Sequence, residues 1–259
     1  MIKRLLIAAA ALLPAWTAGV AAEDSEGRRV RVGLGAQIQP EYYGGDKSEI
    51  GPLWSFDVAS GDDQFRFEAP DDGFDIALYK SGGFAAGPVG KVEGSRKNSD
   101  VGAQVGKVGT TIEAGVFAQY EVADSFRVRS EVRKGIGGHE GWVGSIGADK
   151  IWRDGDNYVF SIGPRVLFSD GRYQRAYFGV SPAAALATGL PQYRPHRGVH
   201  AVAATSGMSY QFNKEFGMFG FARFERLVGD AGKSPLVREL GSRYQTSAGI
   251  GLSYTFLVK

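Results

Sequence analysis

Hydrophobic and polar residues alternate with a period of two along most of this chain. In residues 243–256, Tyr244, Ile250 and Phe256 fall on an apolar face, and small or polar residues lie between such positions. Successive side chains of a strand point to opposite faces, so this alternation predicts strands that separate two environments. Similar patterns predict twelve strands, at residues 30–38, 50–58, 63–69, 74–80, 111–122, 125–134, 142–152, 157–168, 171–180, 198–212, 215–227 and 243–256.

Short turn sequences join several of these strands, which makes the joined strands antiparallel neighbours. They are SGD at 60–62, DDG at 71–73, RDGD at 153–156 and SDG at 169–171. Several predicted strands have twelve or more residues, and a tilted strand needs about 9–11 residues to cross a bilayer. In hydrocarbon, β-structure must close on itself to pair its backbone groups. We therefore predict an all-β, antiparallel, up-and-down transmembrane β-barrel of about 12 strands, within about 10 to 14. A soluble sandwich with one buried face is the alternative.

Aromatic residues stand at both ends of the apolar face of the last predicted strand. Tyr244 is at one end, and Tyr254 and Phe256 are at the other. Outer-membrane barrels carry girdles of aromatic residues at both membrane interfaces. We expect these three rings to lie at the two interfaces.

The first 22 residues have the pattern of a cleaved secretory signal peptide. Lys3 and Arg4 precede an apolar run that ends in small residues up to Ala22. A membrane anchor is disfavoured because Pro14 interrupts the run. The prediction is thus a signal peptide at 1–22, one barrel domain at 23–259, and location in the outer membrane.

The charge and the cysteine content limit the partners and the metal sites that this chain can have. The chain has 30 Lys and Arg against 28 Asp and Glu, and two of the basic residues belong to the signal peptide. A balanced mature chain is not expected to bind nucleic acid. With no cysteine, neither a disulfide framework nor a thiolate metal site is possible. The expected surroundings are outer-membrane lipid and lipopolysaccharide.

Charged residues gather at positions that the alternation places inside the barrel. They are Arg127, Arg129, Glu131, Arg133, Arg165, Arg223, Glu225 and Arg243. Rings of Arg can favour anions in a selective pore, whereas mixed charges can pair and brace a plugged lumen. The interleaved Glu residues favour the plugged lumen.

The sequence gives little support to catalysis, a metal or a cofactor. His139, His196 and His200 are the only histidines, and their spacing does not suggest a metal site. A Ser and a His could still meet in space, as in a barrel lipase, but no motif singles out such a pair.

Counting connections assigns them to the two sides of the membrane. With both termini periplasmic, residues 39–49, 181–198 and 228–241 are expected outside the cell, and 81–110 and 135–141 in the periplasm. The segment 81–110 is long for a periplasmic turn, so either it meets a partner or the strand count is wrong by a pair nearby. A short helix is expected in the second loop, with Ser181 as N-cap, Pro182 in its first turn and Gly189 at its end.

Several phrases together resemble the MltA-interacting protein/OmpV family of outer-membrane proteins. They are FARFERLVGDAGKSPLV at 221–237, GS at 241–242, the final GIGLSYTF, YFGVS at 177–181, TGLPQY at 188–193 and GLGAQIQPEYYGG at 33–45. The resemblance spans the mature chain, although three residues follow Phe256. It implies an outer-membrane barrel that is not an enzyme.

The resemblance also implies partners. Family members are described as scaffolds that link a murein lytic transglycosylase to a penicillin-binding peptidoglycan synthase, and elsewhere as osmoregulated porin-like channels or adhesins. No catalytic residue is implied, so the motif contributes only positions that are expected to shape a wall and a loop: Arg223, Glu225, Arg226, Gly229, Asp230, Ser234 and Pro235.

Overall fold

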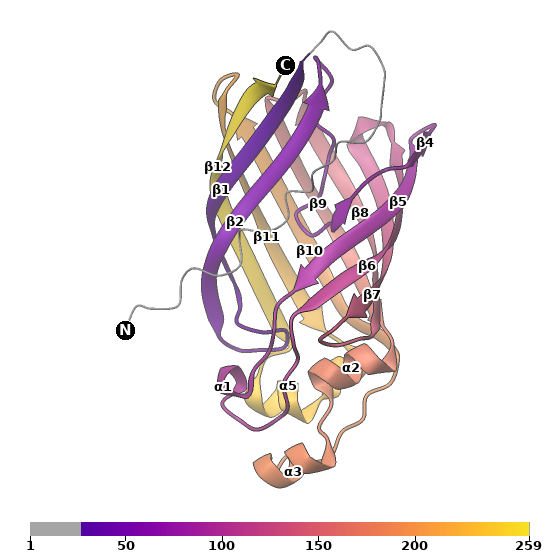
Figure 1. Cartoon of the computed structure of the whole chain (residues 1–259), viewed down its shortest axis with the longest axis vertical. Coiled ribbons are helices and arrows are strands. Elements are labelled where there is room, and N and C mark those ends of the chain that lie inside the picture. The colour runs from indigo at the N-terminus through magenta and orange to yellow at the C-terminus, as the bar shows by residue number, and fades with distance from the viewer. Residues whose placement is uncertain (1–26, 259) are drawn as a thin grey trace.

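One antiparallel sheet of twelve strands forms most of residues 27–258, the part of the chain that the computed structural model describes. The sheet curls into a barrel (Figure 1). Its strands are β1 (Arg28–Pro40), β2 (Ser48–Ser60), β3 (Phe74–Asp75), β4 (Tyr79–Ser81), β5 (Phe84–Glu93), β6 (Thr111–Val122), β7 (Phe126–Ile136), β8 (Trp142–Asp154), β9 (Tyr158–Ser169), β10 (Gly198–Gln211), β11 (Phe216–Leu227) and β12 (Tyr244–Val258). The predicted antiparallel barrel is confirmed. The predicted signal peptide lies outside the described residues.

The first and last long strands pair with each other. β1 lies between β12 and β2, and from β12 the hydrogen-bonded path continues through β11 and back along the chain to β5, which pairs with β3 and β4. Among residues 27–258 no ladder joins β2 to β3, so these two edges face each other across a seam. The rings of Trp54 and Phe74 stack across the seam, with centroids 5.1 Å apart.

The two faces of the sheet have opposite chemistry. In β7, Val128 and Val132 point outward and are exposed, whereas Arg129 and Glu131 between them are buried. The same alternation makes most of the outer wall apolar, as lipid requires, and the lumen polar. Within the described residues, no helix is both long and apolar enough to cross a membrane.

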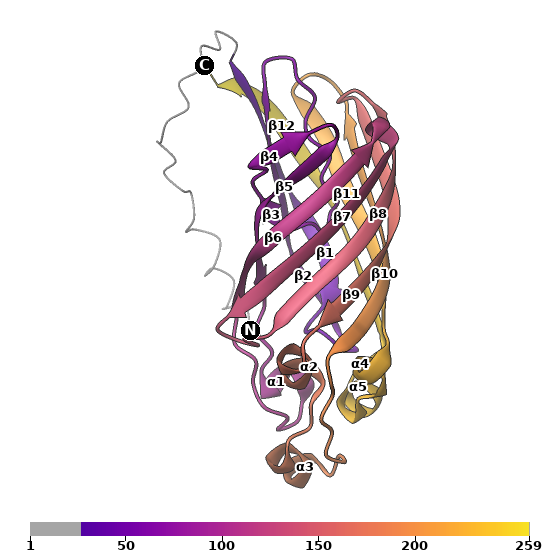
Figure 2. The same ribbon diagram turned by 90° about the vertical axis from the view of Figure 1, so that its right-hand side faces the viewer.

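The two ends of the barrel differ in their connections. At the end where β1 begins and β12 finishes, the connections 82–83, 123–125, 155–157 and 212–215 are short. At the other end lie α1 (Asn98–Val101), α2 (Gly171–Phe178), α3 (Pro182–Thr188), α4 (Gly229–Lys233) and α5 (Pro235–Leu240) (Figure 2). Outer-membrane barrels have short periplasmic turns and longer extracellular loops. By this rule we expect the short-turn end to face the periplasm and the long-loop end to face outward.

The long connections pack into a cap that has its own apolar core. Tyr177 and Phe178 of α2, Leu227 at the end of β11 and Leu236 and Val237 of α5 are buried there. The predicted helix is confirmed as α3: the Ser181 side chain accepts a hydrogen bond from the Ala184 N–H, and Gly189 ends the helix with φ +76°.

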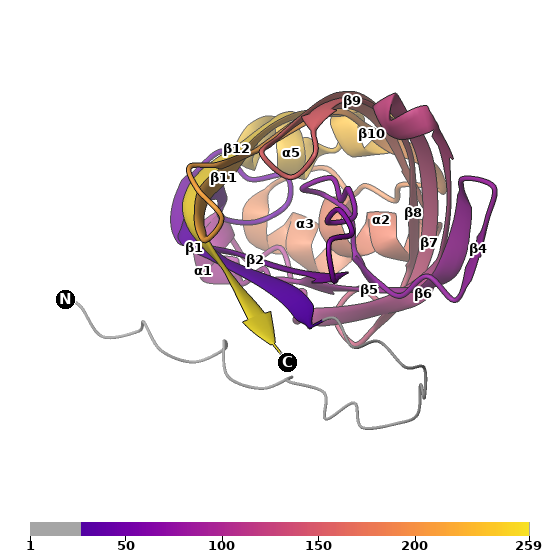
Figure 3. The ribbon, with the colours of Figure 1, turned by 90° about the horizontal axis from the view of Figure 1, so that it is seen from above.

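Two predicted strands are wrong. Residues 63–69 are extended but lie inside the barrel, unpaired to the sheet (Figure 3), because their apolar side chains Phe65, Phe67 and Ala69 pack within the lumen. Residues 171–180 form α2 instead of a strand after a hairpin. Asp170 caps this helix by accepting the Tyr173 N–H, and Tyr173 and Tyr177 share its buried face at helical spacing.

The prediction that 81–110 is periplasmic is also wrong. Residues 84–93 form the strand β5, which forms a hairpin with β4, so only the turn at 82–83 is at the short-turn end. The rest, 94–110, is at the long-loop end with α1. Residues 137–141, which join β7 to β8, lie at the long-loop end as well. The strand count missed β5 because Gly87, Pro88 and Gly90 break its apolar alternation.

Candidate functional site in the lumen

Inward-facing arginines from three strands line the middle of the barrel. Alternation along β7 turns Arg127, Arg129 and Arg133 inward, and β9 and β11 add Arg165 and Arg223. The side chains of Arg127 and Arg129 are 0% and 4% exposed, which means that each guanidinium needs a partner inside the barrel.

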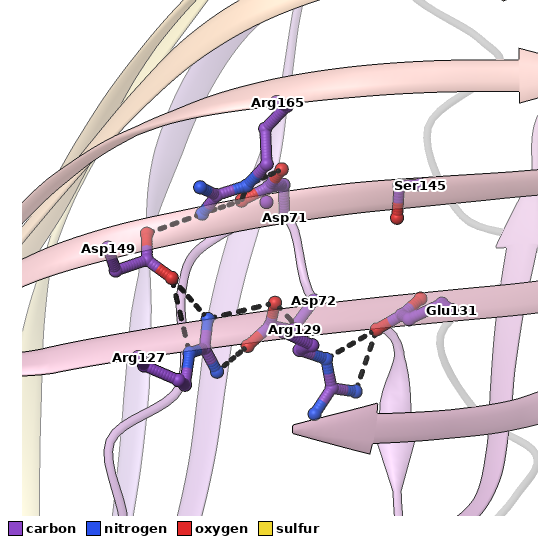
Figure 4. Close-up of a pocket in the computed structure, with 9 residues that line it drawn as sticks. Asp71, Asp72, Arg127, Arg129, Glu131, Ser145, Asp149 and Arg165 are labelled. Carbon is purple, nitrogen blue, oxygen red and sulfur yellow. Dashed lines mark hydrogen bonds and ion pairs between the residues drawn. The ribbon is translucent and has the colours of Figure 1, made fainter. Parts of the chain in front are cut away.

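Carboxylates of the inward segment supply many of these partners. We call residues 61–73, which run from the end of β2 into the lumen, the plug. Asp71 meets Arg165 in a forked contact, with Nε to Oδ2 at 3.0 Å and Nη2 to Oδ1 at 3.1 Å, and also meets Nη1 of Arg223 at 2.6 Å. Asp72 accepts two hydrogen bonds from Arg127, at 2.6 and 3.3 Å (Figure 4).

Carboxylates of the wall complete the cluster. Asp149 of β8 lies between two arginines, 2.7 Å from Arg127 and 2.6 Å from Arg165. Glu131 is 2.7 Å from Arg129 and also contacts Arg133, which in turn is 2.8 Å from Glu113. On β11, Arg223 pairs with Glu225 at 2.5 Å. Each lumenal arginine is thus shared between two or more carboxylates.

The apolar side chains of the plug pack beneath the guanidinium groups. The Arg127 guanidinium lies 4.7 Å from the centroid of the Phe67 ring, and that of Arg31 lies 4.3 Å from Phe65. Such contacts combine cation–π attraction with burial of the ring. Phe67 and Ala69 also pack against Ile151 of β8.

The backbone of the plug is held mainly by hydrogen bonds to side chains. The Phe65 N–H donates to Asp156 at 3.0 Å, and the Gly73 N–H donates to Glu131 at 3.3 Å. Between the plug and the wall there remains a cavity of about 10 Å³, lined by Asp71, Arg127 and Asp149 among others. That is room for about one water molecule. Side chains of the plug and the wall therefore pack closely at this level.

The cap at the long-loop end contains a second set of polar contacts among aromatic rings. Tyr43 donates to Glu225, and burial, followed by the charge of Glu225, raises the pKa of the Tyr43 phenol well above its ordinary value, so this phenol remains protonated. Arg96 donates to the carbonyls of Tyr177 and Ala176, at 2.6 and 3.1 Å, and so ties the α1 connection to α2.

Two histidines of the cap are buried beside polar partners. His139 Nε2 lies 2.9 Å from Glu113, and His200 Nδ1 lies 3.0 Å from Ser169 Oγ. The rings of Tyr173 and Tyr43 surround His200, and both His200 and Ser169 are buried. A substrate could not reach this Ser–His pair without opening the cap, so the pair is better explained as part of the packing.

The structure brings together seven of the eight charges predicted for the lumen: Arg127, Arg129, Glu131, Arg133, Arg165, Arg223 and Glu225. Arg243 does not join them. It lies in the connection before β12 and is exposed, because β12 begins one residue later than predicted.

Sequence reasoning missed the acidic partners of the lumenal arginines. Asp71 and Asp72 were interpreted as turn residues because DDG is a common turn sequence. Asp149 and Glu113 could have been found, since both fall on inward positions of correctly predicted strands.

The motif positions near the end of the chain serve the cap and the wall. Ser234 is fully buried and donates to the Phe178 carbonyl at 2.7 Å, and Pro235 begins α5. Gly229 has φ +57°, a conformation that favours glycine. Asp230 accepts the N–H of His196, and the Arg226 guanidinium lies 5.7 Å from the Tyr244 ring on the outer wall.

The three predicted interface aromatics lie on the outward face of β12. Tyr244, Tyr254 and Phe256 are 55%, 41% and 38% exposed. Tyr244 is at the long-loop end, and the other two are near the short-turn end, where Tyr254 packs against Phe216 with centroids 5.0 Å apart. Their separation along β12 suits the two edges of an apolar band.

Comparisons with known proteins give one family match and several similar solved structures. A family model described as MltA-interacting protein MipA matches residues 32–256. No curated protein sequence matches the chain. Similar solved structures include the KdgM porin, 9% identical with a TM-score of 0.38 over 88% of this chain and 99% of that chain. Others are the NanC porin, at 11% and 0.37 over 88% and 98%, and an outer membrane channel from Pseudomonas putida F1, at 9% and 0.42 over 92% and 100%.

Proposed function

Because this chain belongs to the MipA family of MltA-interacting proteins, we propose that it is a non-enzymatic scaffold that binds a murein lytic transglycosylase at its short-turn end. The protein lies in the outer membrane. A peptidoglycan synthase of the penicillin-binding class is the second partner that such a scaffold would hold.

The observation that carries this proposal is the packing of the lumen. The plug lies inside the barrel between the short-turn end and the cap, and the cavity beside the arginines is about 10 Å³. We infer that a barrel packed in this way does not conduct, so its working surfaces are its two ends. We expect no conductance steps from the refolded mature protein in a planar bilayer, and regular steps would contradict the closed resting state.

The topology of the barrel determines which of its ends a periplasmic enzyme can reach. A murein enzyme works in the periplasm and meets only the short turns, because the long loops lie across the membrane. Exposed charges on separate turns offer contact points: Asp124 between β6 and β7, and Lys214 between β10 and β11. The segments 94–110 and 137–141 cannot serve as contact points in this orientation.

The test is binding of a purified murein lytic transglycosylase to the refolded barrel in detergent. We expect Asp124→Ala combined with Lys214→Ala to weaken binding at least about tenfold, as expected when residues that carry an interface are truncated. The matched control is Arg172→Ala with Glu140→Ala, an exposed ion pair at the long-loop end. Binding that follows the control pair, or no binding by the wild-type barrel, would refute the proposal.

A further inference from the structure

The plug takes no part in the ladders of the sheet. It connects β2 to β3, and within residues 27–258 no ladder joins these two strands across the seam. Its own backbone bonds to the wall are few and involve side chains such as Asp156 and Glu131. What fixes the plug is therefore its side chains: the carboxylates of Asp71 and Asp72, and Arg66, which makes a forked contact with Asp75 of β3 at 2.6 and 2.8 Å.

These two carboxylates occupy a site with the geometry of carboxylate recognition. Arg165 holds Asp71 and Arg127 holds Asp72, each through two N–H groups, as a guanidinium fork holds a bound carboxylate. Arg223 adds a third guanidinium from another strand, 2.6 Å from Asp71. The arginines themselves belong to the rigid wall.

Without the plug, the charges at this point would not balance. Arg127 and Arg165 would share the single carboxylate of Asp149, and Arg223 would keep Glu225. Three buried cations would face two wall anions, and an uncompensated buried charge is costly. Arg127, Arg165 and Arg223 therefore favour an acidic occupant.

We propose that Arg127, Arg165 and Arg223 form a binding site for small dicarboxylate solutes, which Asp71 and Asp72 occupy in the resting barrel. An acidic solute that takes their place releases the plug and opens an anion-selective passage through the wall arginines. The carboxylates of Asp71 and Asp72 belong to adjacent residues. A ligand with two nearby carboxylates therefore fits best. The proposal goes beyond scaffolding and does not depend on any partner at the turns.

The first experiment measures conductance of refolded protein in planar bilayers. Asp71→Asn with Asp72→Asn keeps side-chain shape and removes both charges, so we expect the closed state to be lost, with steps whose reversal potential in a salt gradient shifts toward that of the anion. Adding Arg165→Gln and Arg223→Gln should abolish that shift. The matched control is Asp62→Asn with Asp63→Asn, two exposed acids of the same segment, which should remain silent like the wild type.

Two results would overturn the proposal. A silent Asp71→Asn, Asp72→Asn barrel that shows the folded mobility on a heat-modifiability gel would mean that the carboxylates do not hold the plug. Steps without anion preference would mean that the arginines form no anion site.

A second experiment uses the unchanged protein and does not depend on a variant that folds. Succinate is the probe, and succinamide, its neutral isostere, is the matched control. Succinate should increase hydrogen exchange at the amides of Phe65, Ala69 and Gly73, which the resting plug protects. No increase, or an equal increase with succinamide, would refute the site.

Discussion

The plug lies inside the barrel and the cap lies at its long-loop end, and different kinds of interaction hold them in place. Ion pairs are the principal polar contacts of the plug, and in them Asp71 and Asp72 face four arginines. The cap is fixed by apolar packing among α2, α5 and the end of β11, where Phe178, Leu227 and Leu236 are almost completely buried. Charged contacts are directional and fail when one partner is lost, whereas apolar packing is spread over many neighbours. The contacts of the plug are therefore of a kind that a competing anion can replace, whereas the packing of the cap is not.

Removal of one cation from the plug site should have the largest effect. Arg127→Ala leaves Asp72 and Asp149 buried without their shared guanidinium, and breaking a buried pair costs about 4 kcal/mol. The free energy of unfolding, measured by urea titration of the refolded barrel, should fall by that amount. Arg172→Ala, in an ion pair that is about 60% exposed, should change it by less than about 1 kcal/mol. Equal losses of unfolding free energy in the two variants would contradict the inference that ion pairs fix the plug.

A cavity in the cap should have a somewhat smaller effect. Leu236 is 0% exposed, and truncation of a buried Leu to Ala costs about 3 kcal/mol. The same titration measures the loss, with the 91% exposed Leu186 as control for Leu→Ala. Because the cap does not hold the plug carboxylates, Leu236→Ala should leave the barrel silent in a bilayer. Conductance from this variant would make the cap, and not the plug, the barrier.

The smallest expected effect is a dependence on pH at the surface of the cap. The hydrogen bond from the His196 N–H, 2.9 Å from Asp230, lowers the pKa of Asp230 below its ordinary value of 3.8. A lowered pKa in the folded state adds stability above the ordinary value, and this stability is lost as pH falls through the folded value. For this partly exposed carboxyl the gain is below about 1 kcal/mol.

Amide exchange of residues 194–197, corrected for its intrinsic pH dependence, measures this effect. Protection should decrease when the pH falls from about 6 to about 3. In Asp230→Asn the protection should not depend on pH. A pH response that survives in this variant would assign the effect to another group.

The fold was largely predictable because lipid and lumen impose opposite chemistry on alternate residues. Nine long strands were recognised in this way, from β1 to β12. The same rule failed at 63–69, because an extended segment inside the lumen alternates as a wall strand does: Phe65, Phe67 and Ala69 pack on one side. Periodicity reports an extended chain with two environments and does not report its hydrogen-bond partners.

The lumen site was predictable only in part, for a related reason. Its arginines stand on regular strands, so counting by two located them. Its principal acids, Asp71 and Asp72, lie outside any strand, and their contacts with Arg165 and Arg127 span 94 and 55 positions of sequence. A pattern within one strand carries no information on such a contact.

The pairing of β1 with β12 has a consequence for how the protein is made. Of the described strands, the first along the chain can complete its ladder only with the last, since Arg28 lies opposite Val258. Contacts so distant in sequence are slow to form, and until they do, the growing sheet exposes unpaired edges that invite aggregation. We therefore expect the newly exported chain to depend on chaperones during its passage, and a chain that lacks β12 to remain an open sheet and be degraded.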